Sequence, residues 1–233
     1  MTPIEFSTEF DVLYNNITSN QAPGLNEYEK SIFLTKAQEE IVLGYYNGKN
    51  VFGDSFESTE ELRRQLDALV ETKVYNHTDA NNDSVAGTGV SNNSVFFQLP
   101  SNLAFITMEQ VTFSDESLGC YNDSHPRVNV QPIRQDEYNK IKNNPFKGAT
   151  KYRALRLDAG NGKVEIISKY NFDKYLIRYV NKPEPIILED LPNGLTIEGI
   201  SITNGCKLNP ILHKTILERA VLMALRTKTN TER

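Results

Sequence analysis

Residues 151–180 decide the fold class, and they read KYRALRLDAGNGKVEIISKYNFDKYLIRYV. The stretch holds three short runs rich in β-branched and aromatic residues, and several of these runs alternate between apolar and polar positions. Between the first two runs, residues 158–162 (DAGNG) have the composition of a hairpin turn. The pattern predicts short strands, with a hairpin between the first two.

Three runs of the same kind precede this stretch, at residues 95–100, 105–113 and 127–133. Short strands separated by turn residues are typical of a small β-sandwich or barrel. A short helix is expected from Gln135 to Lys142, because Asn144-Pro145 disfavours its continuation. Residues 76–93 are rich in Asn, Gly and Ser and predict a polar loop.

Helical patterns lie on both sides of the strands. Apolar residues recur every three or four positions over residues 5–17 and again over 25–45. A third helix is expected to open at Ser58, with Glu61 at capping-box spacing, and to bury residues as far as Val70. The last helix begins at Asn209-Pro210, an N-cap followed by proline at the first helical position.

This order predicts an α+β fold in which a helical layer from the N- and C-terminal helices accompanies a central β-sandwich or barrel-like module. We expect residues 1–75 and 206–233 to form a helical assembly domain. Residues 76–205 are expected to form a β module inserted into it.

Composition and charge already exclude some classes of function. The 233 residues include 25 Lys+Arg and 30 Asp+Glu, for a net charge of −5, and 39% are hydrophobic. This is enough apolar material for a core, and the acidic balance argues against wholesale phosphate binding. The charge is uneven, with a net of −7 over residues 1–75 and +5 over residues 151–233. Sequence thirds need not form spatial patches, so this asymmetry can be without consequence; it is also the charge distribution of a subunit whose one end meets the other end of a neighbouring copy.

Catalytic and metal-binding patterns are weak. Cys120 and Cys206 lie in no metal or redox spacing, and the three histidines are scattered. Cys206 with His213 is the one nucleophilic dyad worth considering, and no local pattern supports it. We therefore assign no catalytic, cofactor or metal residue and expect no enzyme activity. No apolar run approaches a membrane span and no export signal is recognisable, so we expect synthesis in a cytoplasm.

Three segments resemble structural ring proteins of crAss-like tailed bacteriophages. They are residues 9–48, 128–168 and 175–188. Residues 206–224, CKLNPILHKTILERAVLMA, resemble the closing segment of head-to-tail connector proteins that sit under the portal in short-tailed phages. The motifs are structural rather than catalytic.

The resemblance implies a homo-oligomeric ring of twelve copies beneath the portal protein, at the head–tail junction of a virion assembled in the host cytoplasm. Its partners would be the portal, neighbouring tail ring proteins and the passing genomic DNA. On this interpretation Arg226, Lys228 and Arg233 contact an acidic partner. Acidic residues are expected to line the DNA channel, and the candidates are Glu57, Glu60, Glu61 and Asp67. The alternative is a binding or decoration module of the tail or capsid, with a ligand surface on the β-sandwich.

Overall fold

The computed structural model describes residues 1–18, 24–48, 60–77, 82–115, 118, 126–192 and 194–231. The chain forms two compact units, residues 1–69 with 182–233 (the helical unit) and residues 70–181 (the β unit). We expected the boundaries at 75/76 and 205/206. Residues 70–75 instead belong to the β unit, and residues 182–205 belong to the helical unit.

The helical unit contains α1 (Pro3–Thr18), α2 (Glu27–Tyr46), α3 (Glu60–Leu66), the 3-10 helix η1 (Asp67–Leu69) and α5 (Pro210–Thr231). A capping box opens α2, where Asn26 accepts from the Glu29 backbone N–H and the Glu29 carboxylate accepts from the Asn26 backbone N–H. The expected start of the third helix, Ser58, lies outside the described residues. Its expected end at Val70 is wrong, because Val70 opens a strand that pairs with Val180.

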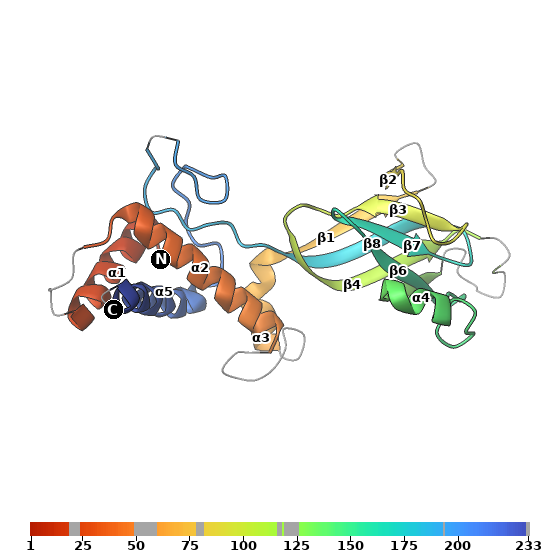
Figure 1. Cartoon of the computed structure of the whole chain (residues 1–233), viewed down its shortest axis with the longest axis horizontal. Helices are drawn as coiled ribbons and strands as arrows, with labels where there is room; N and C mark the ends of the chain where they lie inside the picture. Colours follow the sequence, from red (N-terminus) through yellow and green to blue (C-terminus); the bar gives the residue numbers. More distant parts are fainter. Residues whose placement is uncertain are drawn as a thin grey trace. The chain divides into compact units, whose positions relative to one another are not determined.

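Helices α1, α2 and α5 pack together in the helical unit (Figure 1). The buried residues of each helix recur at helical spacing. Helices α1 and α5 each turn an apolar stripe inward, whereas the buried face of α2 mixes apolar residues with Lys30, Ser31, Thr35 and Gln38. The stripe of α1 consists of Phe6, Phe10 and Tyr14, all at most 1% exposed. The stripe of α5 includes Leu212, Ile216, Leu217, Ala220, Val221 and Ala224.

The β unit holds one eight-stranded sheet in the order β1-β8-β4-β5-β6-β7-β3-β2. The strands are β1 (Val70–Asn76), β2 (Ser84–Val85), β3 (Ser94–Gln98), β4 (Leu103–Phe113), β5 (Arg127–Pro132), β6 (Arg153–Gly160), β7 (Lys163–Ile167) and β8 (Phe172–Asn181). All neighbours are antiparallel except β5 and β6. The sequence pattern missed β1 and the two-residue β2.

The sheet curls until its two ends meet (Figure 1). Tyr75 of β1 lies 5.3 Å from Phe97 of β3 between ring centroids, although five strands separate β1 from β3 in the sheet. The Tyr75 hydroxyl donates to the Gln98 carbonyl at 2.8 Å, and the Asp83 backbone N–H donates to the Asn76 carbonyl at 2.9 Å. The barrel-like form of the predicted α+β fold is therefore confirmed, built from one curled sheet rather than two.

The β6–β7 turn and the helical connection between β5 and β6 both follow from local sequence. Gly160, Asn161 and Gly162 have φ of 85°, 51° and 69°, which is the left-handed backbone that a tight β6–β7 turn requires. Helix α4 (Gln135–Ile141) joins the parallel strands β5 and β6. It covers the outer face of the sheet through a small cluster of buried side chains, Tyr138, Leu155, Leu157 and Ile167.

Candidate assembly surfaces

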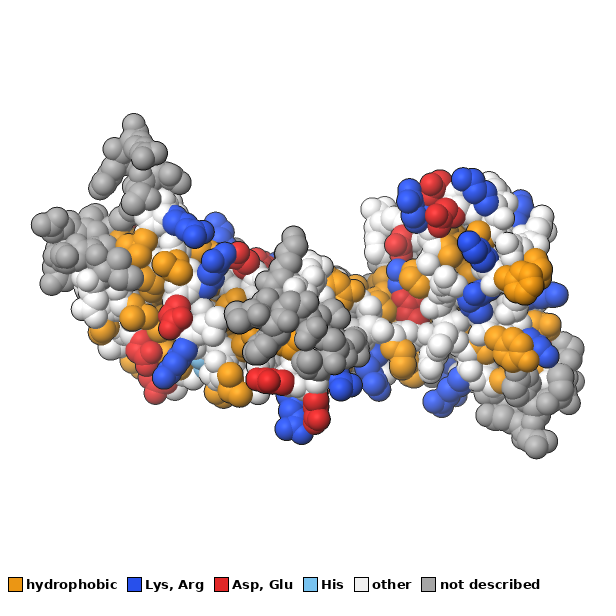
Figure 2. Space-filling view, turned by 90° about the horizontal axis from the view of Figure 1, so that it is seen from below, with side chains coloured by type: hydrophobic (Ala, Val, Ile, Leu, Met, Phe, Trp, Pro, Cys, Tyr) orange, Lys and Arg blue, Asp and Glu red, His pale blue; other side chains and the backbone are white. Residues whose placement is uncertain are grey.

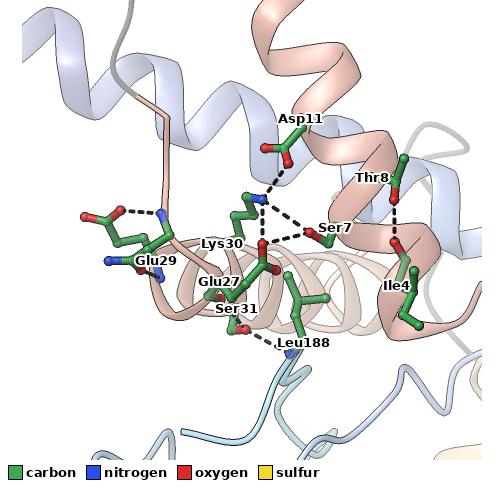
Figure 3. Close-up of polar contacts among 10 residues, drawn as sticks. Ile4, Ser7, Thr8, Asp11, Glu27, Glu29, Lys30, Ser31 and Leu188 are labelled. Atoms are coloured by element: carbon green, nitrogen blue, oxygen red, sulfur yellow. Dashed lines mark hydrogen bonds and ion pairs between the residues drawn. The ribbon is translucent and has the colours of Figure 1, made fainter. Parts of the chain in front are cut away.

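A buried lysine fastens α1 to α2. The Lys30 ammonium lies 2.7 Å from Asp11, 2.8 Å from Glu27 and 3.2 Å from the Ser7 hydroxyl, and the residue is 2% exposed (Figure 3). Burial lowers the pKa of Lys30, but the hydrogen bonds and charges of Asp11 and Glu27 outweigh it and leave that pKa above its ordinary value. Lys30 therefore stays charged and holds α1 in one position.

The outer face of α1 is acidic and partly apolar. Opposite its buried stripe, Ile4 is 77% exposed and Val12 is 54% exposed, and Glu5 and Glu9 are exposed beside them. Residues 3–18 contain three acids and no Lys or Arg. Glu5 accepts from the Thr2 backbone N–H at 2.8 Å, a local cap that leaves its charge on the helix surface. We call this surface, formed by Ile4, Glu5, Glu9 and Val12, the α1 outer face.

An unusual loop of the β unit presents the opposite chemistry. Residues 142–153 contain four Lys or Arg and no Asp or Glu. Within them Phe146 is 85% exposed and Tyr152 is 63% exposed. With Asn129 and Gln131 they line an open groove of about 630 Å³. Figure 2 shows hydrophobic side chains bordered by Lys or Arg side chains on the displayed face of the β unit. We call residues 142–153 the basic aromatic loop.

The basic aromatic loop is held in a defined shape by its own residues. The Arg153 guanidinium donates to the Phe146 and Gly148 carbonyls and to the Gln131 amide oxygen. The Asn144 side chain accepts from the backbone N–H groups of Phe146 and Lys147, at 2.8 and 3.2 Å. A Cβ on Gly148 would lie 2.8 Å from the Asn144 carbonyl oxygen, so the loop needs glycine there. The exposed aromatics thus stand on an ordered support.

Comparison with known sequences identifies the kind of protein. The family described as phage tail ring protein 3/4 matches residues 1–233. The chain belongs to this family. It is 46% identical to Ring protein 3 of Bacteroides phage crAss001, over 98% of this chain and 97% of that protein. It is 38% identical to Ring protein 4/5 of the same phage, over 94% of this chain and 90% of that protein.

Family membership makes the chain a structural ring protein of a tailed-phage virion, and the resemblance to crAss-like phage ring proteins is confirmed. Among the described residues no group of three or more His, Cys, Asp or Glu side chains is placed to hold a metal ion. None of the helices in the described part of the chain combines the length and apolarity needed to cross a membrane.

Two of the three predicted partner-binding residues of the ring protein, Arg226 and Lys228, belong to the last turns of α5. Arg226 is exposed, and its charge helps to lower the pKa of Glu40, mainly set by a hydrogen bond from Arg219. Lys228 is part of α5, but its side chain is not described, and Arg233 lies outside the described residues. Their role in partner binding remains a prediction.

The predicted channel-lining acids lie on one short stretch. Glu60, Glu61 and Asp67 are exposed on α3 and η1, and Glu57 lies outside the described residues. Glu60 pairs with Arg64 at 2.6 Å, so part of this charge is compensated locally. No contact in the structure tests whether these acids face DNA.

The contacts of Cys206 and His213 run in different directions. The Cys206 thiol donates to the Gln38 amide oxygen at 3.2 Å, and burial raises its pKa, which suppresses the thiolate that a nucleophile requires. The His213 ring contacts the Met1 ammonium at 2.7 Å and the Leu208 carbonyl at 3.0 Å. Each residue therefore bonds to other partners within the helical unit, and among the described residues no hydrogen bond joins the Cys206 thiol to the His213 ring.

The surfaces that sequence reasoning missed are the basic aromatic loop and the α1 outer face. The loop carried a recognisable signal, because four basic residues and two aromatics without a single acid are unusual in an acidic chain. The exposure of Phe146 could not be predicted, since most aromatics in the described part of the chain are buried and a core position was the natural assumption.

Proposed function

We propose that the ring protein is a head-to-tail connector. Twelve copies would form a ring beneath the portal at the head–tail junction, join capsid to tail and line the channel through which DNA passes. The full-length match to a phage tail ring family carries this proposal. The resemblance of residues 206–224 to connector proteins under the portal supports its position in the stack.

The charge of the helical unit supports a channel role. Residues 1–69 and 182–233 hold 18 Asp+Glu and 12 Lys+Arg, whereas residues 70–181 hold 12 and 13. A net of −6 on one unit repels the phosphate backbone and lets DNA slide without sticking. Glu60, Glu61 and Asp67 are exposed contributors to that charge.

The end of α5 is our candidate portal contact. Arg226 is exposed near the C-terminus, and Lys228 and Arg233 follow it in the sequence. Cations in the last turns of a helix are also favoured by its dipole. Their contact with an acidic portal surface would weaken as salt rises, because exposed charges are screened.

Co-purification of the ring protein with its portal protein tests the proposal. We expect a stable complex that electron microscopy of the whole virion places at the head–tail junction. Charge reversal by Arg226→Glu, Lys228→Glu and Arg233→Glu should weaken portal binding, most strongly at low salt. Lys214→Glu is a control on the exposed face of the same helix. A monomer or trimer without affinity for the portal would contradict the connector role.

The same experiment separates the second candidate function, a decoration module of tail or capsid. The groove beside Phe146 and Tyr152 favours it, because exposed aromatic and amide side chains together make a ligand surface. A decoration module would lie on the outside of the particle and would not bind the portal protein.

A further inference from the structure

One chain carries two surfaces with opposite chemistry. The basic aromatic loop presents lysines around two exposed aromatic rings. The α1 outer face presents glutamates around two exposed aliphatic side chains. Each surface therefore combines a charge of one sign with apolar anchors, and the two signs are opposite.

The loop has the properties of an interface anchor. Exposed aromatics on an ordered support lose little conformational entropy on binding, and such residues dominate protein interfaces. The Lys151 ammonium lies 5.1 Å from the Tyr152 ring centroid, and Lys147 is exposed next to Phe146. The arrangement suits a partner that is acidic and has aliphatic side chains for the rings to cover.

Other acidic parts of the helical unit fit less well than α1. On α3, Glu60 and Glu61 share the helix with Arg63 and Arg64. Several further exposed acids already hold a basic partner, in the pairs Glu40–Arg219, Glu184–Lys207 and Glu198–Lys182. Within the described residues Glu9 makes no ion pair, and α1 has no basic residue to cancel its charge.

A closed ring of identical copies needs two different surfaces per copy, because each copy meets its two neighbours head to tail. We propose that the basic aromatic loop of one copy docks on the α1 outer face of the next. Phe146 and Tyr152 cover Ile4 and Val12, while Lys147 and Lys151 meet Glu5 and Glu9. This contact rests on the proposed ring function and assigns the residues that close the ring.

Protein is favoured over nucleic acid as the occupant. The Arg153 guanidinium donates its hydrogen bonds to loop carbonyls and to the Gln131 amide oxygen, so these N–H groups are not available to a phosphate. An exposed phenylalanine beside Pro145 fits an aliphatic surface better than a phosphate backbone, whose binding depends on charge. DNA binding by the same loop is therefore an outcome that the test must include.

Self-association of the full chain, followed by mass photometry across a concentration series, tests the contact. The double variant Lys147→Glu/Lys151→Glu should weaken association by about tenfold or more. Lys73→Glu/Lys174→Glu is the matched control, because Lys73 also lies over a tyrosine ring and Lys174 is also exposed. The control should associate like the unchanged chain.

Rescue by charge exchange makes the test specific to α1. Glu5→Gln/Glu9→Lys should weaken association alone, while the glutamine keeps the oxygen that caps the helix. Combining it with Lys147→Glu/Lys151→Glu should restore association to within about threefold of the unchanged chain. Phe146→Ala should weaken association by about tenfold with an unchanged thermal unfolding midpoint, because the side chain is exposed.

The outcomes separate this contact from the ring function. If the unchanged chain assembles and the lysine reversals assemble equally well, the docking is overturned and the ring stands. If the unchanged chain stays monomeric at every concentration, ring assembly itself is contradicted. If the reversals abolish binding to a fluorescent DNA duplex but leave self-association unchanged, the loop is a nucleic-acid surface and the docking is wrong.

Discussion

A single buried polar residue fixes the position of α1 against α2, which apolar packing alone does not specify. Lys30 is buried yet charged, and Asp11, Glu27 and Ser7 satisfy its three donors. The two carboxylates remain partly exposed, at 46% and 33% for Asp11 and Glu27. Their hydration limits the cost of the pair, so Lys30 specifies how α1 lies against α2 more than it adds stability.

Replacing Lys30 with methionine should lower the free energy of unfolding by about 2 kcal/mol. The methionine keeps the apolar stem, but the hydrogen bonds from Lys30 to Asp11, Glu27 and Ser7 are lost. Urea unfolding measures the loss. Lys36→Met, at an exposed position of the same helix, should stay within about 0.5 kcal/mol. Equal effects of the two variants would contradict a specific role for Lys30.

His213 links stability to pH. Its ring lies between the Met1 ammonium and the Leu208 carbonyl, and it packs 5.4 Å from the Phe6 ring between centroids. Burial lowers its pKa below the ordinary 6.5, and the positive charge of the N-terminus acts in the same direction. The neutral ring is therefore the form that the fold accommodates.

Because the folded pKa of His213 is lowered, the unfolded chain binds the proton more readily than the folded chain. The contribution of His213 is fully present above pH 6.5 and is lost as the pH falls from there through the folded pKa. We expect His213→Gln to flatten the dependence of the urea midpoint on pH between about 7.5 and 5. A midpoint that falls equally in both proteins would assign the pH dependence to other groups.

At the scale of elements, helix α2 binds an extended segment through polar side chains. The backbone N–H groups of Leu188 and Ile186 donate to the hydroxyls of Ser31 and Thr35, each at 3.1 Å. The Gln38 amide donates to the Glu184 carbonyl at 2.7 Å. Ser31, Thr35 and Gln38 lie on one helix face, so α2 satisfies backbone groups on one side of this segment. On its other side the segment pairs through Ile187, which forms an isolated antiparallel bridge with Asn204.

Thr35→Val should cost about 1–2 kcal/mol of unfolding free energy, because the buried N–H of Ile186 loses its acceptor while the side-chain shape is kept. Urea unfolding again provides the measurement. Thr8→Val, at an exposed position of α1, is the control and should change stability by no more than about 0.5 kcal/mol. A Thr35→Val protein as stable as the control would mean that water replaces the hydroxyl.

This face shows why the domain boundary could not be predicted. Residues 182–205 follow directly after the last strand, and the apolar run Ile186, Ile187 and Leu188 has the composition of another strand. The backbone N–H groups of Ile186 and Leu188 instead find their acceptors on Thr35 and Ser31, about 150 positions earlier in the chain. Polar residues on a helix predict a solvated face when read locally, and only the tertiary contact turns that face into a binding surface.

At the scale of the whole molecule, the β unit has the construction of an inserted domain. The chain enters through β1 and leaves through β8, and these strands are sheet neighbours with Val70 opposite Val180. The unit has its own core, in which Phe97, Phe113 and Tyr175 are fully buried. The β unit is one continuous segment whose ends are adjacent and which has its own hydrophobic core, and these are the usual requirements for independent folding.

Residues 70–181 produced alone should therefore fold. We expect cooperative urea unfolding by circular dichroism and a compact monomer by gel filtration. Residues 1–69 and residues 182–233 should each fail to fold when produced alone. Helix α2 in the first segment packs against α5 in the second, so the helical unit needs both. Aggregation or a noncooperative transition of residues 70–181 would show that the β unit depends on the helices.

The sequence by itself determined the α+β class, the order of helices and strands apart from β1 and β2, the β6–β7 turn and the ring-protein family, because periodicity, turn chemistry and motifs are local properties. Tertiary structure alone decided where the two units divide, that one sheet closes on itself through Tyr75 and Phe97, and that Phe146 is exposed. The physical reason is that burial depends on partners far away in the chain, which no local pattern encodes.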